Sequence, residues 1–193
     1  MSAKGPMLKR GRVYRTRDLS RWTATPARLA RRLVDEGELR PLAHGLFVHA
    51  RQGRFGAVPP TDEAIMRAFL GGPFVFTGPE QWNALGLGTS AAFAAQLVYN
   101  TKRSGEFRLG GRRFLLRRVS FPRKRSPEWF VIDLFQHAEQ AAADRGELTA
   151  ALAGAVQRRR FDPERLTTMA RKYGSRDTQA RVASALARAG QAA

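Results

Sequence analysis

The sequence predicts an α+β protein, and three observations lead to that fold class. Residues 16–37 have the pattern of two short helices with a turn between them, and residues 38–49 then alternate as strands. Residues 96–119 again alternate as strands, separated by polar and glycine-rich turns. The final third is helical in pattern, with helices expected over residues 129–143, 147–157, 163–173 and 177–189.

Local signals define the two N-terminal helices. Thr16 is suited to cap a first helix over residues 17–21, because its hydroxyl can accept an unpaired backbone N–H there. Thr25 is expected to cap the second helix, and Pro26 then takes the first helical position, where a missing N–H does no harm. Gly37 is expected to end this helix as its left-handed residue.

The second helix has two contrasting faces. Its apolar side carries Leu29, Ala30, Leu33 and Val34. Its polar side carries Arg28, Arg31, Arg32 and Asp35. This 3.6-residue pattern predicts a helix that packs on one side and is hydrated on the other.

Two strands are expected to follow over residues 38–42 and 46–49, joined by a turn of Ala43, His44 and Gly45, with residues 13–15 as a third strand. Helix, turn, arginine-faced helix and ribbon together predict a winged helix-turn-helix. Such a module would place its second helix in the major groove of DNA and its ribbon on the backbone or minor groove. The candidate DNA contacts are Thr25, Arg28, Arg31, Arg32, Arg40 and His44. The alternative is a structural or protein-binding module whose arginines are merely hydrated.

The charge of the chain points to a polyanionic partner. The 193 residues include 34 Lys and Arg against 16 Asp and Glu, which gives a net charge of +18. Residues 1–60 hold 13 basic and 4 acidic side chains, and residues 101–125 hold 10 basic and 1 acidic. Each block therefore carries +9, and the remaining residues sum to zero.

The second basic block has three interpretations: additional nucleic-acid surface, a docking face for an acidic partner, or a hydrated hairpin with no binding role. Gly110-Gly111 predicts a hairpin turn within it. The candidate surface residues are Lys102, Arg103, Arg108, Arg112, Arg113, Arg117 and Arg118.

Residues 51–60 (RQGRFGAVPP) are rich in Gly, Pro and Arg, and they are interpreted as a linker. We therefore expect a winged helix-turn-helix domain over residues 1–58 and a mixed α/β domain with a helical C-terminal tail over residues 59–193. Thr61 is expected to cap the next helix, which Gly71 ends. Asp162 with Pro163 predicts another capped helix start.

No arrangement of residues predicts catalysis, a metal or a cofactor. His44 and His49 are five apart on a ribbon, which places them on opposite faces, and the absence of cysteine removes thiolate ligands. Residues 86–91 (GLGTSA) fit a loose dinucleotide-binding pattern, but a helix rather than a strand is expected before them. Glu128 and Asp133 are five apart on an expected helix, so their carboxylates are not aligned for paired acid–base chemistry. We therefore expect a non-enzyme.

Cellular location is also predicted from composition. No stretch approaches about 20 consecutive apolar residues, and the N-terminus MSAKGPMLKRGR has no apolar signal core. A cytoplasmic protein without a membrane partner is expected.

The order of these elements resembles the AbiEi family, the antitoxins of type IV abortive-infection toxin–antitoxin systems, and its winged-helix relatives among transcriptional regulators. The resemblance lies first in RTRDL and TPARLARRLVDEGELRPLAHGLFVH, where Arg40, Gly45, Leu46 and Phe47 fit the family's wing. It continues in FTGPEQWNALGL over residues 76–87. FDPERLTTMARKYGSRDTQARVASAL, over residues 161–186, is similar to the family's C-terminal helices.

The resemblance implies two activities. The N-terminal domain would repress its own operon by binding inverted repeats in double-stranded promoter DNA. The C-terminal domain would neutralise a nucleotidyltransferase-like toxin encoded next to it, with or without direct contact. A different class of function stays open, that of a basic RNA- or ribosome-associated protein without antitoxin activity. Such a protein would need exposed aromatic side chains or a basic sheet that recognises RNA shape.

Overall fold

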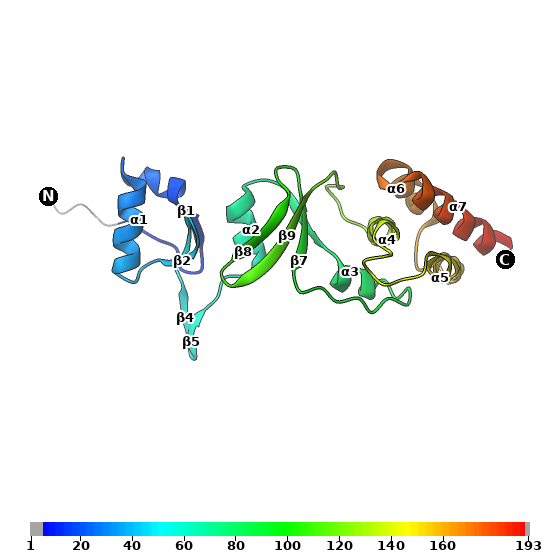
Figure 1. The fold of residues 1–193 in the computed structure, drawn as a ribbon, viewed down its shortest axis with the longest axis horizontal. Helices are drawn as coiled ribbons and strands as arrows, with labels where there is room; N and C mark the ends of the chain where they lie inside the picture. Colours follow the sequence, from blue (N-terminus) through cyan, green and yellow to red (C-terminus); the bar gives the residue numbers. More distant parts are fainter. Residues whose placement is uncertain (1–5, 192–193) are drawn as a thin grey trace. The chain divides into compact units, whose positions relative to one another are not determined.

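The computed structural model describes residues 6–191, and it confirms a fold that mixes α-helices with β-strands (Figure 1). The chain divides into two compact units. Unit 1 comprises the residues up to Phe74 together with Asn100–Leu116, and unit 2 comprises Val75–Tyr99 together with the residues from Arg117 onward. This division differs from the expected boundary after residue 58 in two ways: unit 1 continues to Phe74, and the chain enters unit 1 a second time at Asn100. No described helix is both long enough and apolar enough to cross a membrane.

Unit 1 begins with five short elements around one small sheet. They are β1 (Val13–Arg15), the 3₁₀-helix η1 (Thr16–Arg21), α1 (Pro26–Asp35), β2 (Arg40–Ala43) and β3 (Leu46–Val48). Both β1 and β2 pair antiparallel with β3, so the strand order is β1-β3-β2. The expected third strand beside the ribbon is therefore present.

The first helix differs from its expected form. It is a 3₁₀-helix that already includes Thr16, so Thr16 does not cap it. Instead, the Asp18 carboxylate accepts a hydrogen bond from the backbone N–H of Arg15 at 2.8 Å. A carboxylate satisfies this unpaired donor better than a hydroxyl does, because its charge also favours the helix N-terminus.

Helix α1 follows the sequence prediction closely. Pro26 occupies its first turn, and Gly37 follows the helix with a φ of 76°. Thr25 stands at the N-cap position, but its hydroxyl makes no capping hydrogen bond and lies 3.3 Å from the Thr23 hydroxyl. The buried face of α1 contributes Leu29, Ala30 and Leu33 to a core shared with Tyr14, Leu19 and Leu39.

The prediction of a linker over residues 51–60 is wrong for most of that segment. Strands β4 (Arg51–Gly53) and β5 (Gly56–Val58) form an antiparallel hairpin there. Arg54 and Phe55 form the turn, and Gly56, the first residue of β5, takes a φ of 105°, which only glycine adopts readily. Figure 1 shows this hairpin in cyan, extending away from the β1-β3-β2 sheet.

Helix α2 (Asp62–Leu70) and the hairpin of β8 (Gly105–Leu109) and β9 (Arg112–Arg118) complete unit 1, except for the last residues of β9. Thr61 caps α2, as expected, by accepting a hydrogen bond from the Ala64 backbone N–H at 3.2 Å. Gly110 and Gly111 form the expected hairpin turn with φ values of 58° and 81°. The Gly110 N–H also donates to the Leu42 carbonyl at 2.8 Å, which joins this turn to β2.

Unit 2 is mainly helical. Its elements are β6 (Phe74–Thr77), α3 (Pro79–Ala84), β7 (Gln96–Asn100), α4 (Pro127–Gln136), α5 (Arg145–Gln157), α6 (Pro163–Tyr173) and α7 (Arg176–Gln191). β6 and β7 are neighbours in a sheet, α7 packs on α5 and α6, and α6 packs on α4. Helix α4 is shorter than the expected helix over residues 129–143, because the chain turns after Gln136 and Ala142 takes a φ of 50°.

Candidate nucleic-acid interface

The outward face of α1 carries three exposed arginines, Arg28, Arg31 and Arg32. Arg32 forms an ion pair with Glu36 at 3.5 Å. Neither Arg28 nor Arg31 belongs to an ion pair within the described part of the chain. Arg28 and Arg31 are therefore one helical turn apart on the exposed face of α1, with N–H donors available to a partner. The opposite face of the helix packs on the core.

The other expected contacts lie at the start of α1 and on β2. Thr25 is exposed immediately before α1, Arg40 is exposed at the start of β2, and His44 is exposed in the turn after it. That turn is held close to the unit, because the Thr16 N–H donates to the Gly45 carbonyl at 3.0 Å. The β2–β3 turn is therefore tied to η1, whereas the β4–β5 hairpin extends away from the sheet (Figure 1).

Most of the positive charge lies in unit 1. The residues of this unit include 19 Lys and Arg and 7 Asp and Glu, a net charge of +12. Unit 2 has 15 basic and 9 acidic residues, a net charge of +6. An excess of this size gives unit 1 a field that attracts polyanions, and salt screens it over about 10 Å at 0.1 M.

Several residues of the second basic block have partners within unit 1. The Lys102 ammonium donates to the carbonyl oxygens of Leu70 at 2.7 Å and Gly71 at 2.8 Å, so it caps the C-terminal end of α2. Arg112 binds the Asp62 carboxylate and the Pro60 carbonyl. These contacts give part of the block a structural role, whatever else the block binds.

The remaining residues of the block are divided between the two units. Arg103 lies 4.9 Å from the ring of Phe69, and Arg113 forms an ion pair with Glu106 at 2.7 Å. Arg108 is the cross-strand partner of Arg113 on the exposed side of β8–β9. Arg117 and Arg118 are exposed at the end of β9, in the part of that strand that belongs to unit 2.

One prominent feature was not identified from the sequence: Phe55, which is 97% exposed at the tip of the β4–β5 hairpin. The Arg54 guanidinium lies 5.6 Å from its ring centre. The signal was present as Gly53-Arg54-Phe55-Gly56, an arginine and an aromatic residue between two glycines. It was obscured because each flanking strand has only three residues and no alternation of polar and apolar side chains.

Unit 2 contains a buried carboxylate, Asp133, whose structural role was not predicted from the sequence. Asp133 is 2% exposed and accepts hydrogen bonds from the Thr77 hydroxyl at 2.5 Å, the Trp82 indole at 2.8 Å and the Tyr99 hydroxyl at 2.7 Å. His137 lies 3.4 Å from the same carboxylate. Burial of the Tyr99 hydroxyl, the charge of Asp133 and the hydrogen bond between these two side chains raise the pKa of Tyr99 far above its ordinary value. The charge of Arg117 acts in the opposite direction.

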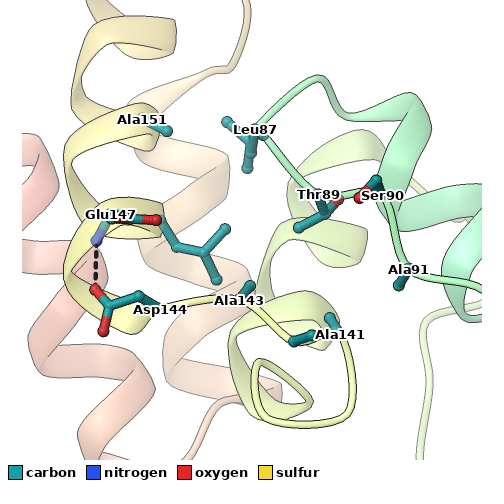
Figure 2. A pocket seen from close by; sticks show the side chains of 12 residues that line it. Leu87, Thr89, Ser90, Ala91, Ala141, Ala143, Asp144, Glu147 and Ala151 are labelled. Carbon is teal, nitrogen blue, oxygen red and sulfur yellow. Dashed lines mark hydrogen bonds between the residues drawn. The ribbon is translucent and has the colours of Figure 1, made fainter.

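A pocket of about 310 Å³ in unit 2 includes part of the loose dinucleotide-binding pattern (Figure 2). It lies between residues 87–91 and the start of α5. Figure 2 shows that the Asp144 carboxylate already accepts the Glu147 backbone N–H, at 2.9 Å. A phosphate bound at the N-terminus of α5 would be repelled by the Asp144 carboxylate. In addition, helix α3 precedes residues 87–91, whereas the dinucleotide-binding pattern requires a strand there.

Among the described residues, no group of three or more His, Asp or Glu side chains is arranged to hold a metal ion. His49 lies 3.4 Å from Glu38, and His44 is exposed in the β2–β3 turn. Glu128 is buried and accepts the Asp162 backbone N–H at 3.3 Å, a contact between α4 and the start of α6.

No protein-family model and no curated protein matches this chain.

Proposed function

We propose that unit 1 is a winged-helix module that binds duplex DNA, with α1 as the element that enters the major groove. The observation that carries this proposal is the combination found in α1: one face is buried through Leu29 and Leu33, and the other presents exposed Arg28 and Arg31. A helix supported from behind and bearing donors on its free face fits the width of the major groove of B-DNA.

The neighbouring elements support this assignment. The order strand, helix, helix, strand, strand, with β3 central in the sheet, is the arrangement that a winged helix needs after its first helix. In this proposal Arg28, Arg31 and Arg32 contact base edges and nearby phosphates, while Arg40 and His44 contact the backbone.

The alternative, an RNA- or ribosome-associated function, receives less support from helix α1 and from the β8–β9 sheet. The major groove of A-form RNA is too deep and narrow to admit a helix such as α1. The exposed side of β8–β9 carries Glu106, Arg108 and Arg113, which are charged rather than aromatic. Base stacking on a sheet, the common route to single-stranded RNA, would need aromatic side chains there.

A salt titration tests the DNA-binding proposal. If about six Arg and Lys side chains contact phosphates, log K for a duplex from the chain's own promoter should fall against log salt with a slope of about −5. The matched probes are a scrambled duplex of equal length and the corresponding RNA duplex. A slope near zero, or equal affinity for the RNA duplex, would contradict the proposal.

We propose further that the chain represses its own promoter and is the antitoxin of a type IV system, acting against a nucleotidyltransferase-like toxin. This proposal rests on the resemblance of residues 15–49, 76–87 and 161–186 to the AbiEi family. It assigns DNA binding to unit 1 and neutralisation to unit 2, which contains the whole of the last two motifs.

Growth rescue separates the two assigned activities. The full chain and its R28A/R31A/R32A variant are expressed from an unrelated promoter, together with an inducible copy of the neighbouring toxin gene. Both should rescue growth, because repression plays no part in this arrangement. Lack of rescue by the full chain would contradict the antitoxin assignment, and loss of rescue in the triple variant alone would contradict the division of roles.

A further inference from the structure

The β4–β5 hairpin has a composition that turn geometry does not explain. Its tip reads Gly53-Arg54-Phe55-Gly56, the chain reverses at Arg54 and Phe55, and Gly56 after them has a positive φ. Neither Arg54 nor Phe55 has a positive φ, so almost any pair of residues could occupy these positions. A phenylalanine with 97% of its surface exposed therefore contributes little to folding, and its position points to a binding role.

The two residues that flank the turn are both glycine. Gly53 and Gly56 are cross-strand partners, and Ala57, opposite Gln52, is the next residue of β5. Glycine in a strand often marks the place where another molecule approaches the backbone closely. The strand pair next to the tip therefore carries no side chain of its own, and the Val58 side chain is the nearest one to Gly53.

The charges around the ring select the partner. Arg54 stacks over Phe55 at 5.6 Å, and Arg51 is exposed at the base of the same hairpin. The hairpin belongs to unit 1, whose net charge is +12, and it contains no acidic residue between Arg51 and Val58. An exposed ring flanked by arginines fits a polyanion whose interior is apolar, which is the chemistry of stacked base pairs between phosphates.

We propose that the β4–β5 hairpin enters the minor groove of duplex DNA and inserts the Phe55 ring between base pairs, with Arg54 and Arg51 on the flanking phosphates. Three residues per strand, at about 3.4 Å each, extend roughly 10 Å. That reach exceeds the depth of the minor groove, about 7.5 Å. Apolar wedges of this kind partly unstack a base step and kink the duplex by about 20–90°. This proposal rests on the proposed DNA binding of unit 1.

The test uses the full chain and four variants: F55A, F55W, R54A and, as the matched control, V119A. Val119 is another exposed apolar residue, 41% exposed, and it lies in unit 2. The probe is the promoter duplex with 2-aminopurine placed in turn at each adenine of the protected region, and a second copy labelled at both ends for energy transfer. Affinity, salt slope, 2-aminopurine fluorescence and end-to-end distance are measured for each protein, after circular dichroism confirms an unchanged melting temperature.

The wild-type chain should raise 2-aminopurine fluorescence at one step and shorten the end-to-end distance. F55A should lose both signals and bind about tenfold more weakly with an unchanged salt slope, because it removes stacking and no charge. F55W should keep both signals, R54A should reduce the slope by about 0.9, and V119A should match the wild type.

Three outcomes have separate meanings. A wild-type chain that shows no salt-dependent binding to the duplex contradicts the proposed function itself. Normal wild-type binding with no fluorescence change, or an F55A variant equal to the wild type, overturns only the insertion of Phe55. Co-sedimentation with phosphatidylserine vesicles that F55A abolishes, without any change at the DNA, would assign the hairpin to membranes and also overturn the inference.

Discussion

The Tyr99 hydroxyl donates a 2.7 Å hydrogen bond to the Asp133 carboxylate, and this contact joins β7 to α4 inside unit 2. The same carboxylate also accepts from Thr77 and Trp82, so a single side chain connects two strands and two helices. A buried charge is stable when hydrogen bonds surround it, and removing it leaves each donor unsatisfied. The first two predictions follow from this arrangement.

Asp133→Ala should lower the free energy of unfolding by about 3 kcal/mol, because three buried donors lose their acceptor together. Tyr99→Phe should lower it by about 1 kcal/mol, since Asp133 keeps its other two donors while the hydrogen bond to Asp133 and the 3.1 Å contact with His137 Nε2 are lost. Urea unfolding followed by circular dichroism measures both. The matched control is Glu139→Ala, an exposed carboxylate close by in sequence, with an expected change within about 0.5 kcal/mol. Equal effects of Asp133→Ala and Glu139→Ala would contradict a structural role of the network.

The raised pKa of Tyr99 predicts a loss of stability in alkali. In the unfolded chain this hydroxyl titrates near pH 10, whereas the folded chain keeps its proton to much higher pH. The stabilisation is therefore complete below about pH 10 and is lost above it, by about 1.4 kcal/mol per pH unit. Urea titrations between pH 9 and 11 should show that the difference in free energy of unfolding between the wild type and Tyr99→Phe becomes smaller as pH rises. Parallel pH profiles for the two proteins would refute this assignment.

Specificity for the promoter should depend on α1 rather than on β2. Arg28→Ala or Arg31→Ala should reduce the preference for promoter over scrambled duplex by about 1–3 kcal/mol, the range of a bidentate arginine–guanine contact. Arg40→Ala should weaken binding to both duplexes alike. Arg171→Ala, on the exposed side of α6, serves as the control for loss of charge alone. If Arg40→Ala reduced the preference while the α1 variants did not, the orientation of the module on DNA would be wrong.

The second basic block should separate into structural and surface residues. Lys102→Met should lower stability by about 1 kcal/mol, because the Leu70 and Gly71 carbonyls lose their donor, and it should leave the salt slope for DNA unchanged. Arg108→Ala should leave stability unchanged and reduce the salt slope by about 0.9, the contribution of one phosphate contact. Thermal melting and the salt titration measure the pair. If Lys102→Met reduced the salt slope of DNA binding and left stability unchanged, Lys102 would be a surface contact and its structural role would be contradicted.

Signals within a few residues predicted the secondary structure well. As expected, Pro26 stands at the start of α1 and Gly37 just after its end, Thr61 caps α2, and Gly110-Gly111 forms the turn of the β8–β9 hairpin. These features depend on caps and on φ angles, which nearby residues determine. The short β4–β5 hairpin was missed because its strands are too brief to show an alternating pattern.

Neighbours distant in sequence decided the rest. The α+β fold class, the arginine-bearing face of α1 and the two blocks of positive charge could all be predicted from the residues alone. Long-range contacts were needed to show that Lys102 caps α2, that Asp133 accepts hydrogen bonds from three other elements, and that Asn100–Leu116 belongs to unit 1. The physical reason is that a charged side chain has the same appearance in a sequence whether it is hydrated or buried. Its role depends on which backbone carbonyls and hydroxyls the fold brings within about 3 Å of it.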